Sequence, residues 1–472
     1  MYSMTVFVLS CQVILCQSMK KNHIENSNWV SNVDWFKFVL RITGDEEGTT
    51  RCFFDLPVEE AWNIPVDMYL SEDSVLEFDI YNIRCKYEGI ITENRDTIYG
   101  NFISPNGDKI PIDLIKTENP PVRTSKRPQE PVKPYPYRSE EVAFFNRIDS
   151  ITLQGTLTMP ESPGPFRAVI LISGSGPNDR DELIWGHRVF LVLADYLTRQ
   201  GIAVLRYDDR GVGRSGGNYD EATFEDFSAD AMAAFEYLNK RPEIDKDHIG
   251  FLGHSEGGAI APLAASTSDE VSFIVLMAAP GYNAIVAKEN GLVSQWEYNY
   301  RNKGASEEAI SFKCNLLSEI FTIAREVTDV NTAKNKISEL IKKSETSLLE
   351  LTEEDRKKIE MESVESYNID WIFSTGFMNI LRYNPQATLS YVSCPVLAIN
   401  GTKDFQMPCD NLAGIEQALK SGGNNDCTVI KIEGLNHLFQ SAKTGQESEY
   451  SKIEETIAPQ ALALISDWIK ND

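Results

Sequence analysis

The stretch that most constrains this chain is residues 248–264, HIGFLGHSEGGAIAPLA. An apolar run typical of a strand leads into Gly253-His254-Ser255-Glu256-Gly257, and small apolar residues typical of a helix follow at once. A strand, one sharp turn and a helix are the context in which a G-x-S-x-G serine is a nucleophile. The turn forces the serine into strained backbone angles, so its neighbours must be nearly free of side chain, as Gly253 and Gly257 are. We predict that the Ser255 hydroxyl is a nucleophile exposed at one edge of a sheet, and that the N–H of Glu256 faces the carbonyl oxygen under attack.

From Val142 onward, predicted strands and helices alternate, which is the pattern of a doubly wound α/β sheet. Strands are expected at 142–145, 151–159, 168–173, 203–207, 249–253, 273–277, 396–400 and 429–432, and helices at 183–198, 224–239, 256–265 and 459–469. The first two strands can form a hairpin, and the others suit a mostly parallel sheet. Between Pro280 and Ser393 helical periodicity replaces the alternation, which predicts a helical cap above the carboxyl ends of the strands.

A serine hydroxyl needs a histidine to take its proton and a carboxylate to orient that histidine. In a site of this kind the acid and then the histidine follow the serine along the chain. The chain has five histidines, and only His437 lies beyond Ser255. The turn after the strand at 396–400 carries one acid, so we predict Asp404, with Asp410 and Glu433 as alternatives.

The second oxyanion donor should come from the glycine-rich turn after the strand at 168–173. We place that donor at the N–H of Ser175, with Gly174 or Gly176 as alternatives and as backbone close to the substrate. His187 lies near this turn in the sequence, so we predict that it contacts the substrate. His254 and His248 are expected to be structural.

The first part of the chain reads as an all-β domain. Between Trp29 and Glu118, apolar and polar residues alternate in short runs separated by turns, which favours a sandwich or small barrel. A proline-rich stretch follows it and reads as a semi-rigid linker. The predicted organisation is a possible signal peptide at 1–18, a β domain at 19–120, a linker at 121–140, an α/β core at 141–281 and 393–472, and the cap at 282–392.

Composition limits the partners. The formal net charge of −25 argues against nucleic acid, and no apolar run approaches the roughly 20 residues of a membrane span. Residues 5–15 have the length of a signal-peptide core, which favours export over a cytoplasmic location, although no positive segment precedes them.

Eight cysteines without a CxxC pair indicate no metal site, and Cys52 and Cys85 either bridge or stay buried thiols. The G-x-G-x-x-G at 211–216 leads into a loop rather than a helix, so we expect no nucleotide and no other cofactor.

With these pieces in place, the chain resembles the α/β-hydrolase superfamily, and within it a group of exported bacterial serine esterases with an N-terminal β domain, variously labelled acyl hydrolase or serine-aminopeptidase-like. The stretches that carry the resemblance are RPQEPVKPYPY at 127–137, ISGSGPNDRDE at 172–182, YDDRGVGRSGG at 207–217, GHSEGG at 253–258, INGTKDFQMP at 399–408 and LNHLF at 435–439. The resemblance implies a triad of Ser255, Asp404 and His437, with oxyanion donors near Ser175 and Glu256.

The expected activity is hydrolysis of small-molecule carboxylic esters with small or medium acyl groups, through an acyl-enzyme intermediate and without a cofactor. Two alternatives remain open. One is an aminopeptidase or thioesterase on the same triad, for which Glu256 is a candidate to hold a substrate amine. The other is a protein that binds a glycan or a partner through its β domain and is not a catalyst.

Overall fold

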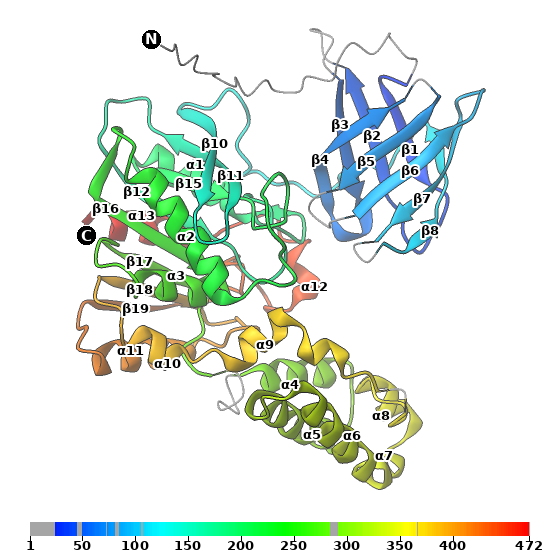
Figure 1. Ribbon diagram of the computed structural model, residues 1–472, viewed down its shortest axis with the longest axis vertical. Coiled ribbons are helices and arrows are strands. Elements are labelled where there is room, and N and C mark those ends of the chain that lie inside the picture. The colour runs from blue at the N-terminus through cyan, green and yellow to red at the C-terminus, as the bar shows by residue number, and fades with distance from the viewer. Residues whose placement is uncertain are drawn as a thin grey trace, which may run out of the picture. The chain divides into compact units, whose positions relative to one another are not determined.

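The computed structural model describes residues 24–44, 50–71, 73–80, 85–104, 107–283, 291–365 and 367–471. The chain divides into two compact units, residues 1–124 and 125–472. The first unit is coloured blue to cyan in Figure 1. The predicted leader at 1–18 lies outside the described residues. Among the helices that the structure describes, none is both long enough and apolar enough to cross a bilayer.

The first unit is an antiparallel β-barrel of eight strands, which is one of the two all-β forms expected. The strands follow the order β6-β5-β4-β3-β2-β1-β9-β7, and β7 pairs back to β6 to close the ring, with β8 beside β7. Their bounds are β1 Ser27–Ser31, β2 Val39–Gly44, β3 Thr50–Leu56, β4 Ala61–Leu70, β5 Val75–Ile80, β6 Cys85–Ile91, β7 Thr97–Ile103, β8 Lys109–Pro111 and β9 Leu114–Thr117, with a short 3-10 turn η1 at Pro57–Glu59. Alternate side chains point inward, and the buried rings of Phe38, Phe54, Phe78 and Tyr87 pack together inside the barrel.

The second unit is built on an eight-stranded sheet with the order β10-β11-β15-β12-β16-β17-β18-β19. The strands are β10 Arg138–Asn146, β11 Ile151–Met159, β12 Phe166–Ile172, β15 Ala203–Tyr207, β16 Ile244–His254, β17 Ile274–Met277, β18 Val396–Gly401 and β19 Cys427–Ile432. β10, β11 and β15 pair antiparallel, and from β15 to β19 every pairing is parallel. The expected mostly parallel sheet that begins with a hairpin is therefore present.

Helices cover both faces of this sheet, so the central strands β15, β17 and β18 are buried along their whole length. On one face lie α2 (Phe224–Leu238), α3 (Gly257–Ala265) and α11 (Asn411–Ser421), and on the other α1 (Val189–Arg199) and α13 (Pro459–Asn471). The start of α2 is fixed by a capping box, in which the Thr223 hydroxyl and the Asp226 carboxylate each accept the backbone N–H of the other residue.

The helix predicted at 183–198 begins later than expected. Residues 183–188 form a small hairpin of β13 (Leu183–Ile184) and β14 (His187–Arg188), and α1 starts only at Val189. The two residues of its turn, Trp185 and Gly186, have φ values of 50° and 76°. Two consecutive left-handed residues make a tight hairpin turn and cannot lie inside a right-handed helix, so the apolar pattern alone misassigned this segment.

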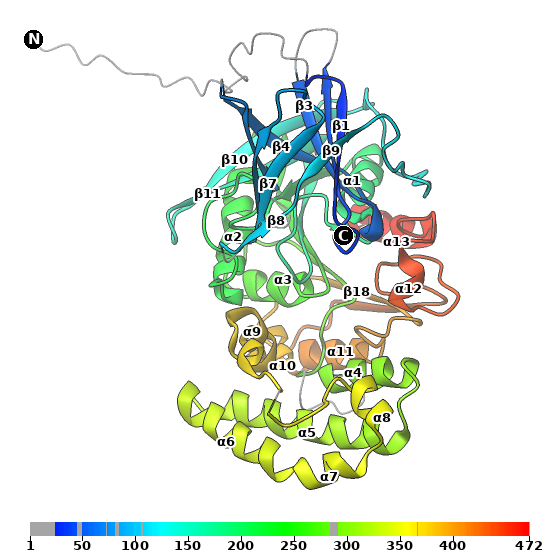
Figure 2. The same ribbon diagram turned by 90° about the vertical axis from the view of Figure 1, so that its right-hand side faces the viewer.

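A helical insertion follows β17 (Figure 2). It consists of α4 Leu292–Asn302, α5 Glu307–Glu326, α6 Val330–Lys343, α7 Glu345–Glu350, α8 Glu353–Lys358, η3 Asp370–Phe373, α9 Thr375–Arg382 and α10 Pro385–Leu389. Four of its aromatic rings pack on one another, those of Trp296, Phe321, Trp371 and Phe377. The Trp296 ring centroid lies 5.1 Å from that of Phe321 and 5.7 Å from that of Trp371. The insertion thus has a core of its own, and Leu389 of α10 already packs into the core of the sheet.

The proline-rich stretch after the barrel lies against the second unit. The guanidinium of Arg127 donates to the carbonyl oxygens of Gly186, Ser451 and Ile453. The Gln129 side chain accepts the N–H groups of Thr456 and Ile457, and Tyr137 donates to Asp195. These contacts hold the stretch to the turn between β13 and β14, to α1, and to the residues between the short helix α12 (Glu447–Tyr450) and α13.

Candidate active site

Ser255 occupies the sharp turn between β16 and α3, and its φ is 53°. A left-handed conformation is rare for a serine and is the strain that a G-x-S-x-G turn imposes. A Cβ on Gly253 would overlap the carbonyl oxygen of Gly257, and one on Gly257 would overlap the carbonyl oxygen of Ile172. The turn can therefore form only because both positions are glycine. The N–H of Ser255 donates to the carbonyl of Met277, 2.8 Å away, which fixes the turn to the neighbouring strand.

Asp404 follows β18 and His437 follows β19, and their side chains meet. Asp404 Oδ2 lies 2.9 Å from His437 Nδ1. Asp404 Oδ1 accepts the backbone N–H groups of Gln406 and Met407, at 2.9 and 2.8 Å. Because the carboxylate faces Nδ1, that nitrogen carries the proton and Nε2 is left to accept one. Both side chains are almost fully buried, so the pair is shielded from water.

The two alternative acids do not reach the histidine. Asp410 forms a surface ion pair with Lys431 at 3.1 Å, and Glu433 is exposed. His437 is instead held by its own loop, where the Asn436 side-chain oxygen accepts the N–H groups of Leu438 and Gln440. This loop fixes the backbone on both sides of the imidazole.

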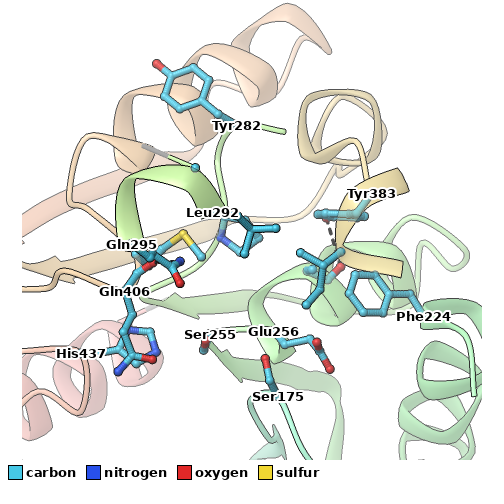
Figure 3. Close-up of a pocket in the computed structure, with 15 residues that line it drawn as sticks. Ser175, Phe224, Ser255, Glu256, Tyr282, Leu292, Gln295, Tyr383, Gln406 and His437 are labelled. Atoms are coloured by element: carbon cyan, nitrogen blue, oxygen red, sulfur yellow. Dashed lines mark hydrogen bonds between the residues drawn. The ribbon is translucent and has the colours of Figure 1, made fainter. Parts of the chain in front are cut away.

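The turn after β12 offers one unoccupied donor. The N–H of Gly174 is bound by Glu182 Oε1 at 2.8 Å, and that of Gly176 by the Tyr219 hydroxyl at 2.8 Å. Within the described part of the chain, the N–H groups of Ser175 and Glu256 have no protein acceptor. Ser175, Glu256 and Ser255 line the same pocket (Figure 3). Of the three turn residues proposed as donors, only Ser175 keeps an N–H for a ligand, and the two glycines shape the turn.

The pocket has a volume of about 200 Å³ and is roofed by the insertion (Figure 3). Its apolar wall comes from both core and cap, and two of its polar residues, Gln295 and Gln406, lie near His437 (Figure 3). The apolar residues are Phe224, Ala259, Pro280, Leu292, Ile380 and Met407, and the polar ones include Tyr282, Gln295, Tyr383 and Gln406. None of these was predicted individually, because periodicity does not show which cap residues face the sheet. Only Gln406 and Met407 carried a signal, since they follow Asp404 directly.

Among the described residues that line the pocket, Glu256 alone carries a carboxylate. Burial raises the pKa of Glu256 to about 7, and a hydrogen bond with the Ser175 side chain offsets part of that effect. The side chain therefore titrates near neutral pH, and both its acid and its carboxylate form are available to a ligand.

His187 is a correction to the sequence prediction. The structure places it outside the pocket, with no exposed surface. Its Nδ1 lies 3.0 Å from the Thr456 hydroxyl and its Nε2 lies 2.9 Å from the Tyr450 carbonyl oxygen. Since the β13–β14 hairpin turns this residue toward the loops before α13, His187 binds them and not a substrate.

The structure also shows a buried carboxylate that sequence reasoning did not assign. Glu182, the last residue of the 172–182 motif, contacts His254, the residue before Ser255. The segment 211–216 is a loop, as predicted, and is held by the ion pair of Arg210 with Asp230 at 2.7 Å. No group of three or more metal-ligating side chains occurs among the residues that the structure describes.

Comparison with known proteins finds hydrolases among the similar ones. Residues 186–304 match the family described as serine aminopeptidase, S33. Esterase EstD of Thermotoga maritima is 27% identical over 209 residues, which is 43% of this chain and 45% of that protein. Thiohydrolase aneE of Aspergillus aculeatus is 33% identical over 138 residues, 29% of this chain and 40% of that protein. The chain thus spans less than half the length of these relatives.

Among solved structures, the Pyrococcus furiosus esterase Pf2001 is 15% identical, with a TM-score of 0.41 over 74% of this chain and 98% of that one. The order of the sheet, the strained turn at Ser255 and the match over residues 186–304 all point to one fold. The second unit has the α/β-hydrolase fold, and its residues 186–304 are similar to the family described as serine aminopeptidase, S33.

Proposed function

We propose that this protein is a serine hydrolase that cleaves carboxylic esters of small or medium acyl groups. The observation that carries the proposal is the 2.9 Å contact of Asp404 with His437 Nδ1, beside a pocket that Ser255 and His437 share. With the proton on Nδ1, His437 Nε2 carries none, so it can act as the base that Ser255 needs.

In the proposed reaction, Ser255 Oγ attacks the acyl carbon and its proton passes to His437 Nε2. The negative charge on the carbonyl oxygen is held by the N–H groups of Ser175 and Glu256, and each such donor is worth about 3 kcal/mol. The imidazolium then gives its proton to the departing alkoxide, so the alcohol leaves and the acyl-enzyme remains. Water attacks the ester carbon with His437 as base, and the acid and free Ser255 are released.

The size of the pocket supports the acyl range. Pockets for drug-sized ligands occupy roughly 300–1,000 Å³, and this one is smaller, at about 200 Å³. Its apolar wall suits an alkyl chain, and Gln295 and Gln406 add hydrogen-bonding groups near His437. We therefore expect acetyl to butyryl esters to be better substrates than long-chain esters.

The test is fluorophosphonate labelling and hydrolysis of p-nitrophenyl acetate and butyrate by wild type and Ser255→Ala. Ser266→Ala is the matched control, because Ser266 directly follows α3, the helix after Ser255, and its hydroxyl donates to the Leu263 carbonyl oxygen and lies outside the pocket lining. Loss of labelling and turnover in Ser255→Ala alone would support the proposal. A wild type that neither labels nor turns over would refute it and favour a binding role.

A second candidate is cleavage of amides or esters that carry a free amine, and Glu256 favours it. An ammonium group on the acyl side would meet the Glu256 carboxylate, which lines the pocket. Glu256→Gln should then lose much more activity on an alanine p-nitroanilide than on p-nitrophenyl butyrate. Equal losses on both substrates would remove the peptidase candidate. A butyryl thioester in the same panel tests the thioesterase alternative.

A further inference from the structure

A buried pair of ionisable side chains lies directly behind the proposed triad. Glu182 and His254 are 0% and 1% exposed. His254 Nδ1 lies 2.9 Å from Glu182 Oε1, and His254 Nε2 lies 3.0 Å from the backbone carbonyl oxygen of His437. The rings of His254 and His437 have centroids 5.1 Å apart. The pair therefore contacts the backbone of the proposed base and not its reacting nitrogen.

The two partners of His254 fix how many protons the pair holds. A carbonyl oxygen and an ionised carboxylate can only accept hydrogen bonds, whereas a neutral imidazole has one N–H. Both contacts are satisfied only when Glu182 and His254 together carry one extra proton, which sits on the imidazole when Glu182 is ionised. Burial by itself lowers the pKa of His254, but the Glu182 carboxylate and the hydrogen bonds outweigh it and raise that pKa.

The charged groups around His254 agree with this state. Glu182 faces it from the turn after β12, and Asp404 contributes a weaker negative field from the turn after β18. His437, after β19, faces it with a carbonyl oxygen. Glu182, Asp404 and the His437 carbonyl oxygen all favour the protonated imidazole of His254.

The same carboxylate also holds the oxyanion turn. Glu182 Oε1 accepts the N–H of Gly174 at 2.8 Å, and the next residue is the proposed donor Ser175. One chain of hydrogen bonds therefore runs from the turn after β12, through Glu182 and His254, to the loop of His437 after β19. The longest step of this chain of hydrogen bonds, from His254 to His437, joins residues that are 183 positions apart in the sequence.

Stability does not explain the pair. Glu182 has a φ of 50°, and its second oxygen, Oε2, is buried without a hydrogen-bond partner among the described residues. A strained backbone and an unsatisfied buried carboxylate oxygen both destabilise a fold. Arrangements of this kind persist where they position a functional group.

We propose that Glu182 and His254 form a positioning pair that sets the oxyanion donor Ser175 and the base His437 relative to each other. This inference rests on the proposed serine hydrolase function. Neither residue touches the reacting atoms, so the pair acts through the two segments that it joins. A displacement of about 1 Å between such groups can cost roughly 100-fold in rate, which sets the scale of the expected effect.

The test compares Glu182→Gln and His254→Gln with wild type on p-nitrophenyl butyrate. His248→Gln is the matched control, because His248 also pairs with a carboxylate, Asp245 at 2.8 Å, at the other end of the same strand β16. Active sites are counted by fluorophosphonate titration, so that unfolded protein does not enter the rate. We expect kcat per active site to fall about 10- to 100-fold in both variants, with KM changed less than about threefold and with no loss in the control.

The pH profile separates positioning from a merely structural role. In wild type, kcat should fall at alkaline pH as His254 loses its proton. Glu182→Gln removes the negative charge that stabilises the imidazolium, so this limb should move to lower pH. His254→Gln has no such group, so its low kcat should lack the limb.

Wild-type kcat per active site and an unmoved alkaline limb in both variants would overturn the proposal. Failure of wild type to label would instead overturn the proposed function itself. If the variants do not fold, ¹⁵N-histidine NMR of wild type decides: His254 must show protons on both ring nitrogens at neutral pH, and a neutral ring would refute the pair.

Discussion

The hydroxyl of Tyr383 donates a hydrogen bond to the carbonyl oxygen of Ala259, 3.2 Å away. Tyr383 directly follows α9 of the insertion, and Ala259 lies in α3, the helix after Ser255. Both residues line the pocket (Figure 3). This wall of the pocket is thus bonded to the helix that follows Ser255.

Shortening this wall should change the acyl preference. Tyr383→Phe keeps the ring and loses only the hydrogen bond, so we expect a loss of about 1 kcal/mol in stability and an unchanged preference. Tyr383→Ala opens the pocket, so the ratio of kcat/KM for octanoate over butyrate should rise on the order of tenfold. Parallel measurements on p-nitrophenyl esters check this, and an unchanged ratio in Tyr383→Ala would show that Tyr383 does not bound the acyl site.

Replacing the acid of the pair tests how His437 is oriented. In Asp404→Asn the amide no longer stabilises the imidazolium or fixes its tautomer, so kcat should fall by roughly 10³- to 10⁴-fold. Asp410→Asn is the control, since that carboxylate sits in a surface ion pair with Lys431. Steady-state kinetics on p-nitrophenyl butyrate give the comparison, and equal effects of the two variants would contradict the assignment of Asp404.

Gly253, two residues before Ser255, should not tolerate a side chain. A Cβ on Gly253 would overlap the backbone of Gly257, so Gly253→Ala should lose several kcal/mol of stability or fail to fold. Gly376, in α9, has open space around its Cα, so Gly376→Ala should be neutral or stabilising by about 0.5–1 kcal/mol. Thermal melts of both variants provide the measurement, and a native melting temperature in Gly253→Ala would contradict the close approach.

Glu256 should make stability depend on pH. Its folded-state pKa is raised to about 7, above the value of an exposed glutamate, so its contribution to stability is present at acid pH and is lost as pH rises toward 7. Glu256→Gln removes the cost of ionising this buried group. We expect its Tm to exceed that of wild type by roughly 2 °C or more at pH 8, with little or no gain at pH 5, by differential scanning calorimetry. A gain of the same size at both pH values would show that the carboxyl does not titrate in the folded protein.

Much of the fold follows from local patterns. The strands β11 and β15 have the bounds predicted from their apolar runs. The glycines around Ser255 predict the strained turn that the structure shows there. His437 could be selected because chain order left one histidine. These inferences need only neighbouring residues or their order along the chain.

What could not be predicted depends on contacts between distant segments. Trp185 adopts a left-handed conformation that its residue type does not announce, so the β13–β14 hairpin was read as the start of a helix. His187 was placed near the substrate because it is close to the oxyanion turn in sequence, yet its partner Thr456 is 269 residues away. Glu182 was visible in the motif, but its contact with His254 arises only when the sheet brings their strands together.

The bonds of Arg127 have a practical consequence for dissecting this protein. A catalytic fragment cut at the first strand of the sheet, near residue 138, would lack the guanidinium that joins Gly186 to Ser451 and Ile453. The peptide that reads as a spacer is therefore part of the scaffold that holds the β13–β14 hairpin and the C-terminal segment together. A fragment without the barrel should therefore begin before Arg127, so that the hydrogen bonds of its guanidinium are kept.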